Sequence, residues 1–287
     1  MAITTHLRAA ANRVLRSFNV RLETYTTELA EQRRLQKLER RDHFDRAVFP
    51  ILPQFRDCDP APIFEQIGRD AKRFAEITSA ADGYSLRNDY CTTPDAEVLY
   101  SMVQKYRPSQ IIEVGSGNST KLFRIAITDA GSNSYLTSID PHPRRDITPY
   151  ADQVVANNVE ELDSGAAFGR LRTNDFLFID SSHQAAPGND VNLLLLSVLP
   201  SLASGVLIHF HDIFLPYEYP RTVDRRWNWT EQYVLQALLT GSNSYRVLWP
   251  GHYLQRTYSG FADRFDNWRD SVARSLWLQR RSEDVTR

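Results

Sequence analysis

The sequence contains little cysteine, and the cysteines it has form no recognisable pattern. Among its 287 residues there are only two, Cys58 and Cys91. They make neither a closely spaced metal-binding pair nor a disulfide framework. Sparse cysteine of this kind is typical of a reducing compartment, and we expect a cytoplasmic protein.

An excess of charge of one sign and a long apolar run are also missing. Lysine and arginine number 34 against 35 aspartate and glutamate, which gives a net charge of −1. This balance indicates neither a nucleic-acid partner nor an anionic membrane surface. The longest apolar region, residues 191–210, is interrupted by Asn192, Pro200 and Gly205. We therefore expect a helix and a strand there, and no membrane span. The N-terminus also lacks the apolar core of a secretory signal.

A strand–turn–helix pattern is present at residues 110–120. A short apolar run ends at Val114, Gly115 and Gly117 follow, and polar residues then open a predicted helix. Glycine lets the backbone approach a ligand closely, and the free N–H groups of a helix start attract polar or anionic groups. Asp140 ends the next predicted strand, near the spacing at which a βαβ unit presents a carboxylate to a ribose. The pattern predicts a site for a nucleoside-containing ligand.

This pattern departs from the dinucleotide fingerprint in two ways. Thr120 stands where the third glycine would be, and an acid, Glu113, precedes the turn. Both departures count against a nicotinamide-dependent oxidoreductase, although Gly115, Gly117 and Asp140 also fit half of a dinucleotide site. That oxidoreductase stays the first alternative function. A non-catalytic nucleoside-binding scaffold is the second.

The rest of the chain predicts an α/β fold. A helical arm is expected over residues 1–48, a single domain over 49–262 and a helical tail over 263–287. Strands are expected at residues 110–114, 134–139, 153–156, 176–179, 206–210, 245–249 and 253–256. Helices are expected at about 63–77, 95–105 and 188–199, with Thr93 capping the second, and the run at 225–233 is expected to open a further helix that ends at about 239. Strands that alternate with helices at this spacing indicate a doubly wound, mostly parallel sheet.

The arm combines apolar and basic residues. Leu7, Val14, Phe18 and Leu22 recur at helical spacing, and arginines lie between them. One interpretation is a basic amphipathic arm that binds a membrane surface or a partner. The other is a helix whose apolar face docks on its own domain or on a second subunit. Interspersed glutamates favour docking, and we expect a homo-oligomer formed through the arm.

Ionisable side chains follow several of the predicted strands. Glu113, Asp140, Asp180 and the pair His211–Asp212 all stand at such ends. In an open α/β sheet, ligands bind beyond the carboxyl ends of the strands, where strand order reverses. Buried carboxylates are costly unless they are paired, so a purely structural role gives little reason for this placement.

These motifs resemble the class I S-adenosylmethionine-dependent methyltransferases. The carrying patterns are Glu-x-Gly-x-Gly with Asp140, the IDSSH run at 179–183 and HFHDIF at 209–214, which resemble a bacterial group of that class. The resemblance covers about residues 84–253. It implies a seven-stranded Rossmann-like sheet, and the helical arm expected before it is an N-terminal extension outside the resemblance. The near-neutral charge and the aromatic loop at 213–220 favour O-methylation of a small hydroxylated metabolite or sugar. The resemblance also implies an S-adenosylmethionine site formed by Glu113, Gly115, Ser116, Gly117, Ser119, Asp140 and Asp180.

The second half is also similar to the catechol-type O-methyltransferases, which hold magnesium. The matching positions are Asp180, His211 and Asp212 as metal ligands and His183 as the base. Here His211 replaces a carboxylate and His183 replaces a lysine. Magnesium prefers oxygen ligands, so a softer divalent ion, or no metal with a histidine base, is equally compatible. The resemblance thus implies that His183, His211 and Asp212 are catalytic.

Further candidates lie beside these motifs. His209 alternates with Phe210 on a buried strand, which favours a hydrogen-bonded core histidine over a functional one. Tyr217, Trp227 and Asn228 are candidates for an acceptor pocket, with core packing as the alternative.

Overall fold

The computed structural model describes residues 2–20, 22, 25–80, 83–88, 90–223 and 229–282. The chain divides into two compact units, Met1–Val48 and Phe49–Arg287. No helix within the described ranges combines the length and apolarity needed to cross a membrane.

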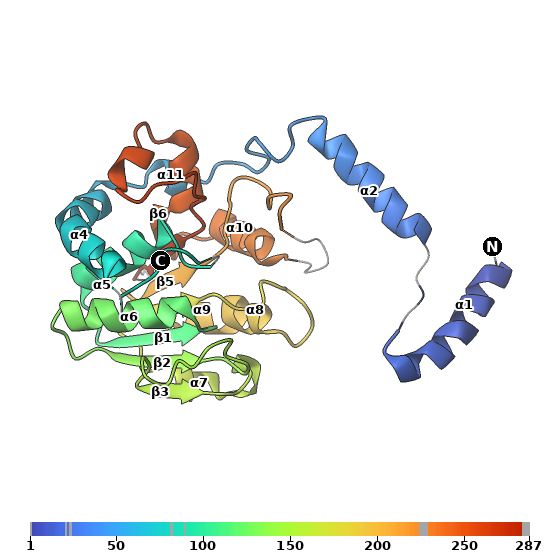
Figure 1. The fold of residues 1–287 in the computed structure, drawn as a ribbon, viewed down its shortest axis with the longest axis horizontal. Coiled ribbons are helices and arrows are strands. Elements are labelled where there is room, and N and C mark those ends of the chain that lie inside the picture. The colour runs from blue at the N-terminus through green and yellow to red at the C-terminus, as the bar shows by residue number, and fades with distance from the viewer. Residues whose placement is uncertain are drawn as a thin grey trace, which may run out of the picture. The chain divides into compact units, whose positions relative to one another are not determined.

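The Met1–Val48 unit is helical, as expected for the arm. It contains α1 (Ala2–Leu15), the short 3₁₀ helix η1 (Arg16–Phe18) and α2 (Tyr25–Glu39), which Figure 1 shows in blue. The apolar side chains of Leu7, Val14 and Phe18 are 66%, 66% and 71% exposed. These three side chains form an exposed apolar stripe on the unit.

The Phe49–Arg287 unit is built on one mixed sheet. In the described part of the chain, seven strands lie in the order β3-β2-β1-β4-β5-β7-β6. Their bounds are β1 Gln110–Val114, β2 Tyr135–Ile139, β3 Gln153–Val155, β4 Phe176–Ile179, β5 Leu207–Phe210, β6 Tyr245–Pro250 and β7 Leu276–Arg280. The first five strands run parallel, and β7 is antiparallel to both β5 and β6. Strand order reverses between β1 and β4, which is where an open α/β sheet binds its ligands.

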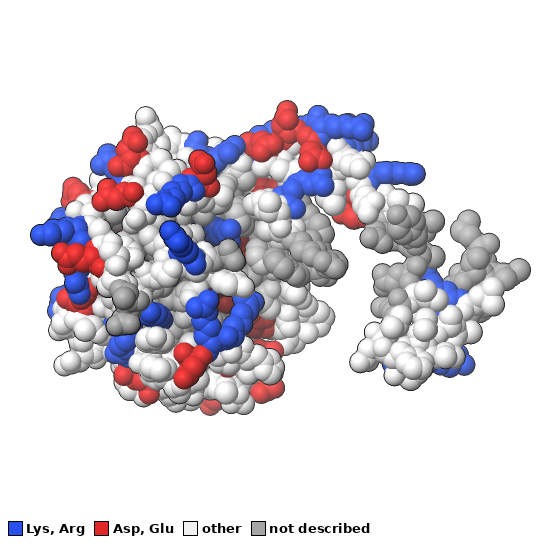
Figure 2. Space-filling view, in the orientation of Figure 1, with Lys and Arg blue, Asp and Glu red and all other residues white. Residues whose placement is uncertain are grey.

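Helices cover both faces of the sheet. Around the strands lie α3 Pro53–Arg56, α4 Ala61–Ser79, α5 Asp95–Tyr106, α6 Asn118–Asp129, α7 Ser164–Phe168, α8 Asp190–Leu193, α9 Leu199–Ser201, α10 Glu231–Gly241 and α11 Gly251–Thr257 (Figure 1). Short 3₁₀ turns η2 Val159–Glu161 and η5 Ala262–Arg264, and a π-helical turn η3 Leu194–Val198, complete the connections. Charged side chains of both signs are interspersed over the visible face of this unit (Figure 2).

Two hydrophobic cores form because successive strand residues point to opposite faces. Ile111 packs with α4, α5 and α6, whereas Ile112 packs with the helices from α7 to α10. Phe178 and Leu177 divide between the two cores in the same way. The central strands are buried on both faces, which explains their nearly continuous apolar sequences.

Three sequence expectations are wrong near the chain's ends and turns. The tail 263–287 is not helical throughout, because Leu276–Arg280 forms β7 and inserts between β5 and β6. Residues 253–256, expected as a strand, belong to helix α11. Pro94 takes the cap position of α5, while the Thr93 hydroxyl donates to Glu97 Oε1 at 2.8 Å.

The first difference has a physical reason in the packing of β7. Trp277 faces one core and Leu276 and Leu278 face the other, so burial on both sides favours a strand at this place. That burial depends on pairing with β5 and β6, which are distant in the sequence, and tertiary packing routinely overrides local propensity.

Candidate functional site

The loop between β1 and α6 requires glycine at its first position. Gly115 has φ +85°, and a Cβ placed there would lie 1.9 Å from the carbonyl oxygen of Asp180. A Cβ on Gly117 would meet nothing within 4 Å. The loop is thus packed tightly against the end of β4 on one side and open on the other, which suits close approach of a ligand to its backbone.

The side chain of Glu113 stabilises this loop through hydrogen bonds. Its side chain is 0% exposed. Its Oε1 accepts a hydrogen bond from the Ser119 hydroxyl at 2.6 Å, and its Oε2 accepts from Thr120 and Ser138, each at 2.6 Å. Burial raises the pKa of Glu113 to about 7, against the lowering effect of the three hydroxyl donors. The side chains of Glu113 and Ser119 therefore brace the start of α6, and their contact with a cofactor stays a prediction.

Thr120 explains the missing third glycine. Its hydroxyl oxygen accepts a hydrogen bond from the Gly117 N–H at 3.0 Å while donating to Glu113. The hydroxyl thereby fixes the turn through side-chain bonding.

Asp140 lies beside the loop, as expected for an acid at the end of β2. Its Oδ2 accepts from the Ser116 hydroxyl at 2.6 Å and its Oδ1 from the His142 N–H at 2.8 Å. The carboxylate is partly exposed. These hydrogen bonds orient the carboxylate toward the loop, and its oxygens can still accept a hydrogen bond from a further hydroxyl group.

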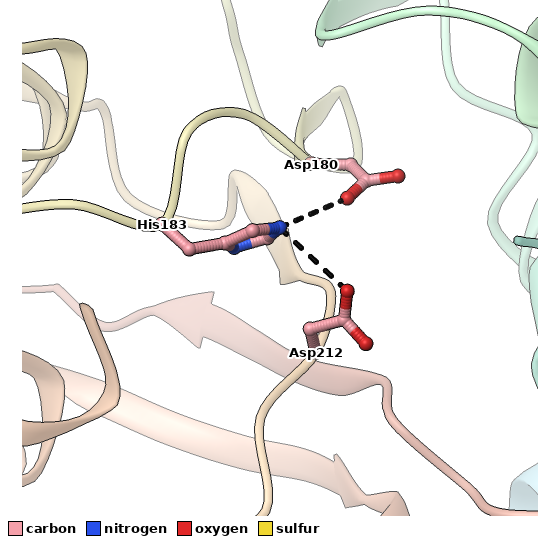
Figure 3. Close-up of side chains that lie close together, drawn as sticks. All are labelled: Asp180, His183 and Asp212. Carbon is pink, nitrogen blue, oxygen red and sulfur yellow. Dashed lines mark ion pairs between the residues drawn. The ribbon is translucent and has the colours of Figure 1, made fainter. Parts of the chain in front are cut away.

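The ends of β4 and β5 bring four ionisable side chains together. Because these strands are adjacent, Asp180 lies next to His211 and Asp212, and His183 approaches from the loop after β4. Figure 3 shows His183 Nε2 pointing between two carboxylates, at 3.4 Å from Asp180 Oδ1 and 3.6 Å from Asp212 Oδ2. His211 Nδ1 lies 3.7 Å and 3.6 Å from the same two oxygens. The expected polar cluster is present at the reversal point of the sheet.

His183 is held by the start of α10. Its Nδ1 lies 2.8 Å from Glu231 Oε2, and the Glu231 side chain is fully buried. The backbone carbonyl of His183 accepts from the N–H groups of Thr230 at 2.8 Å and Glu231 at 3.1 Å. His183 has φ +59°, in the left-handed region that is strained for a residue with a side chain. The helix start holds it in that conformation.

His211 has a looser arrangement. Its Nε2 lies 4.0 Å from Asp95 Oδ2, too far for a hydrogen bond. Asp95 is fixed by the N–H groups of Arg274 at 2.9 Å and Ser275 at 3.1 Å. Asp212, the residue after His211, also has a left-handed backbone, with φ +55°, and its Oδ1 lies 3.3 Å from Arg274 Nη1.

The mutual proximity of these groups shifts their pKa values. Burial lowers the pKa of both histidines, but the neighbouring carboxylates outweigh it. As a result the pKa of His211 is raised to about 9 and that of His183 lies well above its ordinary value. Burial raises the pKa of Asp180 and Asp212, but the histidines more than reverse it and hold both below the usual range. The cluster favours two anions with a compensating positive charge between them.

The donor atoms can also enclose a metal ion. Three possible ligand atoms lie within 4.8 Å of one another, one each from Asp180, His183 and Asp212. The sequence assigned His211 to the metal and His183 to the base. The structure places His183 Nε2 between the two carboxylates and backs it with Glu231, so it is at least as well placed as His211 to be a ligand.

Two residues of the site were missed from the sequence, Glu231 and Asp95. Each is an acid in the first turn of a helix, a common position that favours the helix dipole and carries no functional signal. Only the packing of α5 and α10 against the strand ends reveals their role.

The remaining candidates divide as follows. His209 is a core histidine, stacked on Phe178 with ring centroids 3.8 Å apart and bonded through Nε2 to Ser275 Oγ at 3.1 Å. Tyr217 packs against His252, at 5.2 Å between ring centroids. Trp227 and Asn228 lie outside the described residues.

Comparisons with known proteins give one family match and several similar structures. Residues 112–213 match the family model described as a methyltransferase domain. No curated protein sequence matches the chain. Two solved structures resemble it with bound S-adenosylhomocysteine. The *Podospora anserina* methyltransferase PaMTH1 is 13% identical, with 79% of this chain and 92% of that one covered and a TM-score of 0.43. An O-methyltransferase from *Bacillus cereus* is 14% identical, with 76% and 89% covered and a TM-score of 0.41. The apo structure of CmcI-N160 is 14% identical, with 74% and 84% covered and a TM-score of 0.43.

The matched segment contains the glycine loop, Asp140 and the acids that follow β4 and β5. Residues 112–213 thus match a methyltransferase domain over the part of the chain that builds the site.

Proposed function

We propose that this chain methylates an oxygen atom of a small hydroxylated metabolite or sugar. The observation that carries the proposal is the contact between the two halves of the site. The backbone of Gly115, in the cofactor loop, packs directly on the carbonyl of Asp180, the first member of the histidine–carboxylate cluster. A ligand lying along the loop thus ends beside groups that can take up a proton.

S-adenosylmethionine supplies a methyl group on a sulfonium, which an acceptor displaces in line. In the proposal, the open side of the loop at Gly117 receives the cofactor, while Ser116 and Asp140 hold its ribose hydroxyls. The chain contributes mainly by positioning the acceptor against the methyl group, because in-line displacement depends more on orientation than on a covalent intermediate with the protein. Deprotonation of the acceptor supplies the rest of the barrier reduction.

His211 is the proposed base. His183 is fixed by a 2.8 Å contact with Glu231, whereas the 4.0 Å separation of His211 from Asp95 leaves its ring free to exchange a proton. Asp212 and Asp180 keep Nδ1 of His211 in the cluster from 3.6 Å and 3.7 Å. In this role the neutral form of His211, populated as the pH approaches its pKa of about 9, accepts the acceptor's hydroxyl proton at Nδ1, and Asp212 stabilises the resulting imidazolium.

The proposal is tested in two steps. Isothermal titration with S-adenosylmethionine should show binding that Asp140→Ala weakens by about 1–3 kcal/mol, the scale of a lost charged hydrogen bond. Asp146→Ala, an exposed acid of the same loop, serves as the matched control and should bind normally. Tight binding of a nicotinamide dinucleotide with none of S-adenosylmethionine would refute the proposal.

The second step uses labelled methyl groups and a panel of hydroxylated small molecules. His211→Ala should lower methyl transfer about 10²-fold or more and leave cofactor affinity nearly unchanged. Equal activity of His211→Ala and the parent protein would remove His211 from the role of base.

A further inference from the structure

The distances within the cluster are the starting point. Charge-assisted N–H···O bonds are about 2.7–2.9 Å long. The four nitrogen–oxygen distances that link His183 and His211 to Asp180 and Asp212 are 3.4, 3.6, 3.7 and 3.6 Å. They are too long for such bonds. Two ligand atoms bound at about 2.1 Å in a tetrahedral arrangement lie about 3.4 Å apart, which these distances approach.

The second observation is the partner of the other ring nitrogen. Histidines that bind a metal usually donate their remaining N–H to a carboxylate, which fixes the tautomer and aims the free nitrogen at the ion. Glu231 Oε2 lies 2.8 Å from His183 Nδ1, and Glu231 Oε1 is buried without any hydrogen-bond partner within the described structure. Among the described side chains, Glu231 therefore bonds only to the His183 ring. The other ring nitrogen, His183 Nε2, faces Asp180 Oδ1 and Asp212 Oδ2.

The third observation is the kind of donor. Magnesium takes oxygen ligands and keeps several waters, whereas imidazole suits zinc, iron, copper and nickel. A site in which a tautomer-fixed imidazole nitrogen occupies the space between two carboxylates does not suit magnesium. His183 and Asp212 are buried, at 5% and 8% exposed, and the Asp180 side chain is 32% exposed.

We propose that Asp180, His183 and Asp212 bind a transition-metal dication in preference to magnesium, with Glu231 as the positioning residue that fixes the His183 tautomer. This inference rests on the proposed function, because it places the ion beside the acceptor of that same site. There a bound dication would make an acceptor hydroxyl more acidic, and His211 would take the proton that is released.

The test uses the full chain after treatment with a chelator. Cobalt(II) is the probe, because its visible absorption reports a mixed nitrogen–oxygen shell independently of activity. We expect one equivalent to bind with visible bands, and a hundredfold excess of magnesium to leave them unchanged. Absence of binding, or displacement of cobalt by an equal concentration of magnesium, overturns the inference.

Variants connect the signal to the named residues. His183→Ala should weaken cobalt binding at least 100-fold, and Glu231→Gln should weaken it about 10- to 100-fold with altered bands. His43→Ala, in the separate Met1–Val48 unit, is the histidine control and should bind as the parent does. Circular dichroism of each variant verifies the fold. Unchanged cobalt affinity and bands in a folded Glu231→Gln protein overturn the role of Glu231.

Calorimetry with S-adenosylmethionine separates this inference from the proposed function. A protein that binds the cofactor but no cobalt contradicts the metal site and leaves the methyltransferase proposal standing. A protein that binds cobalt but no cofactor supports the metal site and contradicts the proposal of methyl transfer.

Discussion

At the scale of single residues, three residues of the site have positive φ angles. Gly115, His183 and Asp212 have φ angles of +85°, +59° and +55°. A left-handed conformation costs a residue with a side chain about 1–2 kcal/mol, so the surroundings must hold it in place. The contacts of His183 with α10 and of Asp212 with Arg274 supply that restraint.

Gly115 offers a direct measurement of this close packing. Gly115→Ala should lower the free energy of unfolding by more than about 3 kcal/mol, because its Cβ would overlap the Asp180 carbonyl. Gly131→Ala is the matched control, since Gly131 has φ +58° but open space around it. It should cost only about 1 kcal/mol. Equal losses for the two variants in urea unfolding would show that the Asp180 contact is unimportant.

Glu113 predicts a pH dependence of stability. Its pKa is raised from 4.5 to about 7 in the folded chain by burial, so the folded state binds more protons than the unfolded state between these values. The stability that Glu113 contributes is therefore present below about pH 4.5 and is lost as the pH rises to 7.

Glu113→Gln removes this titration and tests the sign. The free energy of unfolding of the parent, minus that of the variant, should fall by up to about 1.4 kcal/mol per pH unit between pH 5 and 7. Denaturant unfolding at several pH values measures the difference. A difference that stays constant or rises over this window contradicts the shift.

At the scale of elements, β7 holds together the end of the sheet that is formed by β5, β7 and β6. It lies between β5 and β6 and runs antiparallel to both. Trp277, at its centre, is 0% exposed and contacts the rings of Phe176 and His209 at 5.2 Å and 4.9 Å between centroids. The residues just before β7, Arg274 and Ser275, hold Asp95 behind His211. The last strand thus connects the core with the site.

Trp277→Ala should lower the free energy of unfolding by about 3–5 kcal/mol, the usual cost of emptying a buried tryptophan site. Trp268→Ala is the control of the same residue type, because Trp268 is only partly buried at the edge of the same core. It should cost clearly less in urea unfolding. Similar losses for both variants would contradict the central position of β7.

At the scale of the whole molecule, the two units have different tasks. All of the described site residues belong to Phe49–Arg287, whereas Met1–Val48 has its own helices and an exposed apolar stripe. Exposed apolar surface of this kind favours association. We expect the arm to form contacts between copies of the chain.

Deletion of residues 1–48 should preserve cofactor binding while changing the oligomeric state or solubility. Calorimetry measures the cofactor binding, and light scattering after size exclusion measures the oligomeric state. Replacement of Leu7, Val14 and Phe18 by serine in the full chain should reproduce the effect of the deletion. A monomer before and after both changes, with equal solubility, contradicts this role of the arm.

Local patterns of the sequence were sufficient for the centre of the fold. The five parallel strands, the glycine turn and the acids at the strand ends follow from side-chain periodicity and from the backbone demands of a tight turn. Adjacency of β4 and β5, implied by resemblance, then brings Asp180, His211 and Asp212 together. These features depend on residues that are close in the chain or on a common strand order.

The tertiary structure alone decided which side chains face the ligand edge and which support it. Glu113 belongs to the recognisable motif but lies under the loop, and Glu231 and Asp95 carry no motif yet stand behind the two histidines. β7 exists because Trp277 and its neighbours are buried on two faces by strands distant in the sequence. Burial and contact between distant segments depend on packing, which a local pattern does not encode.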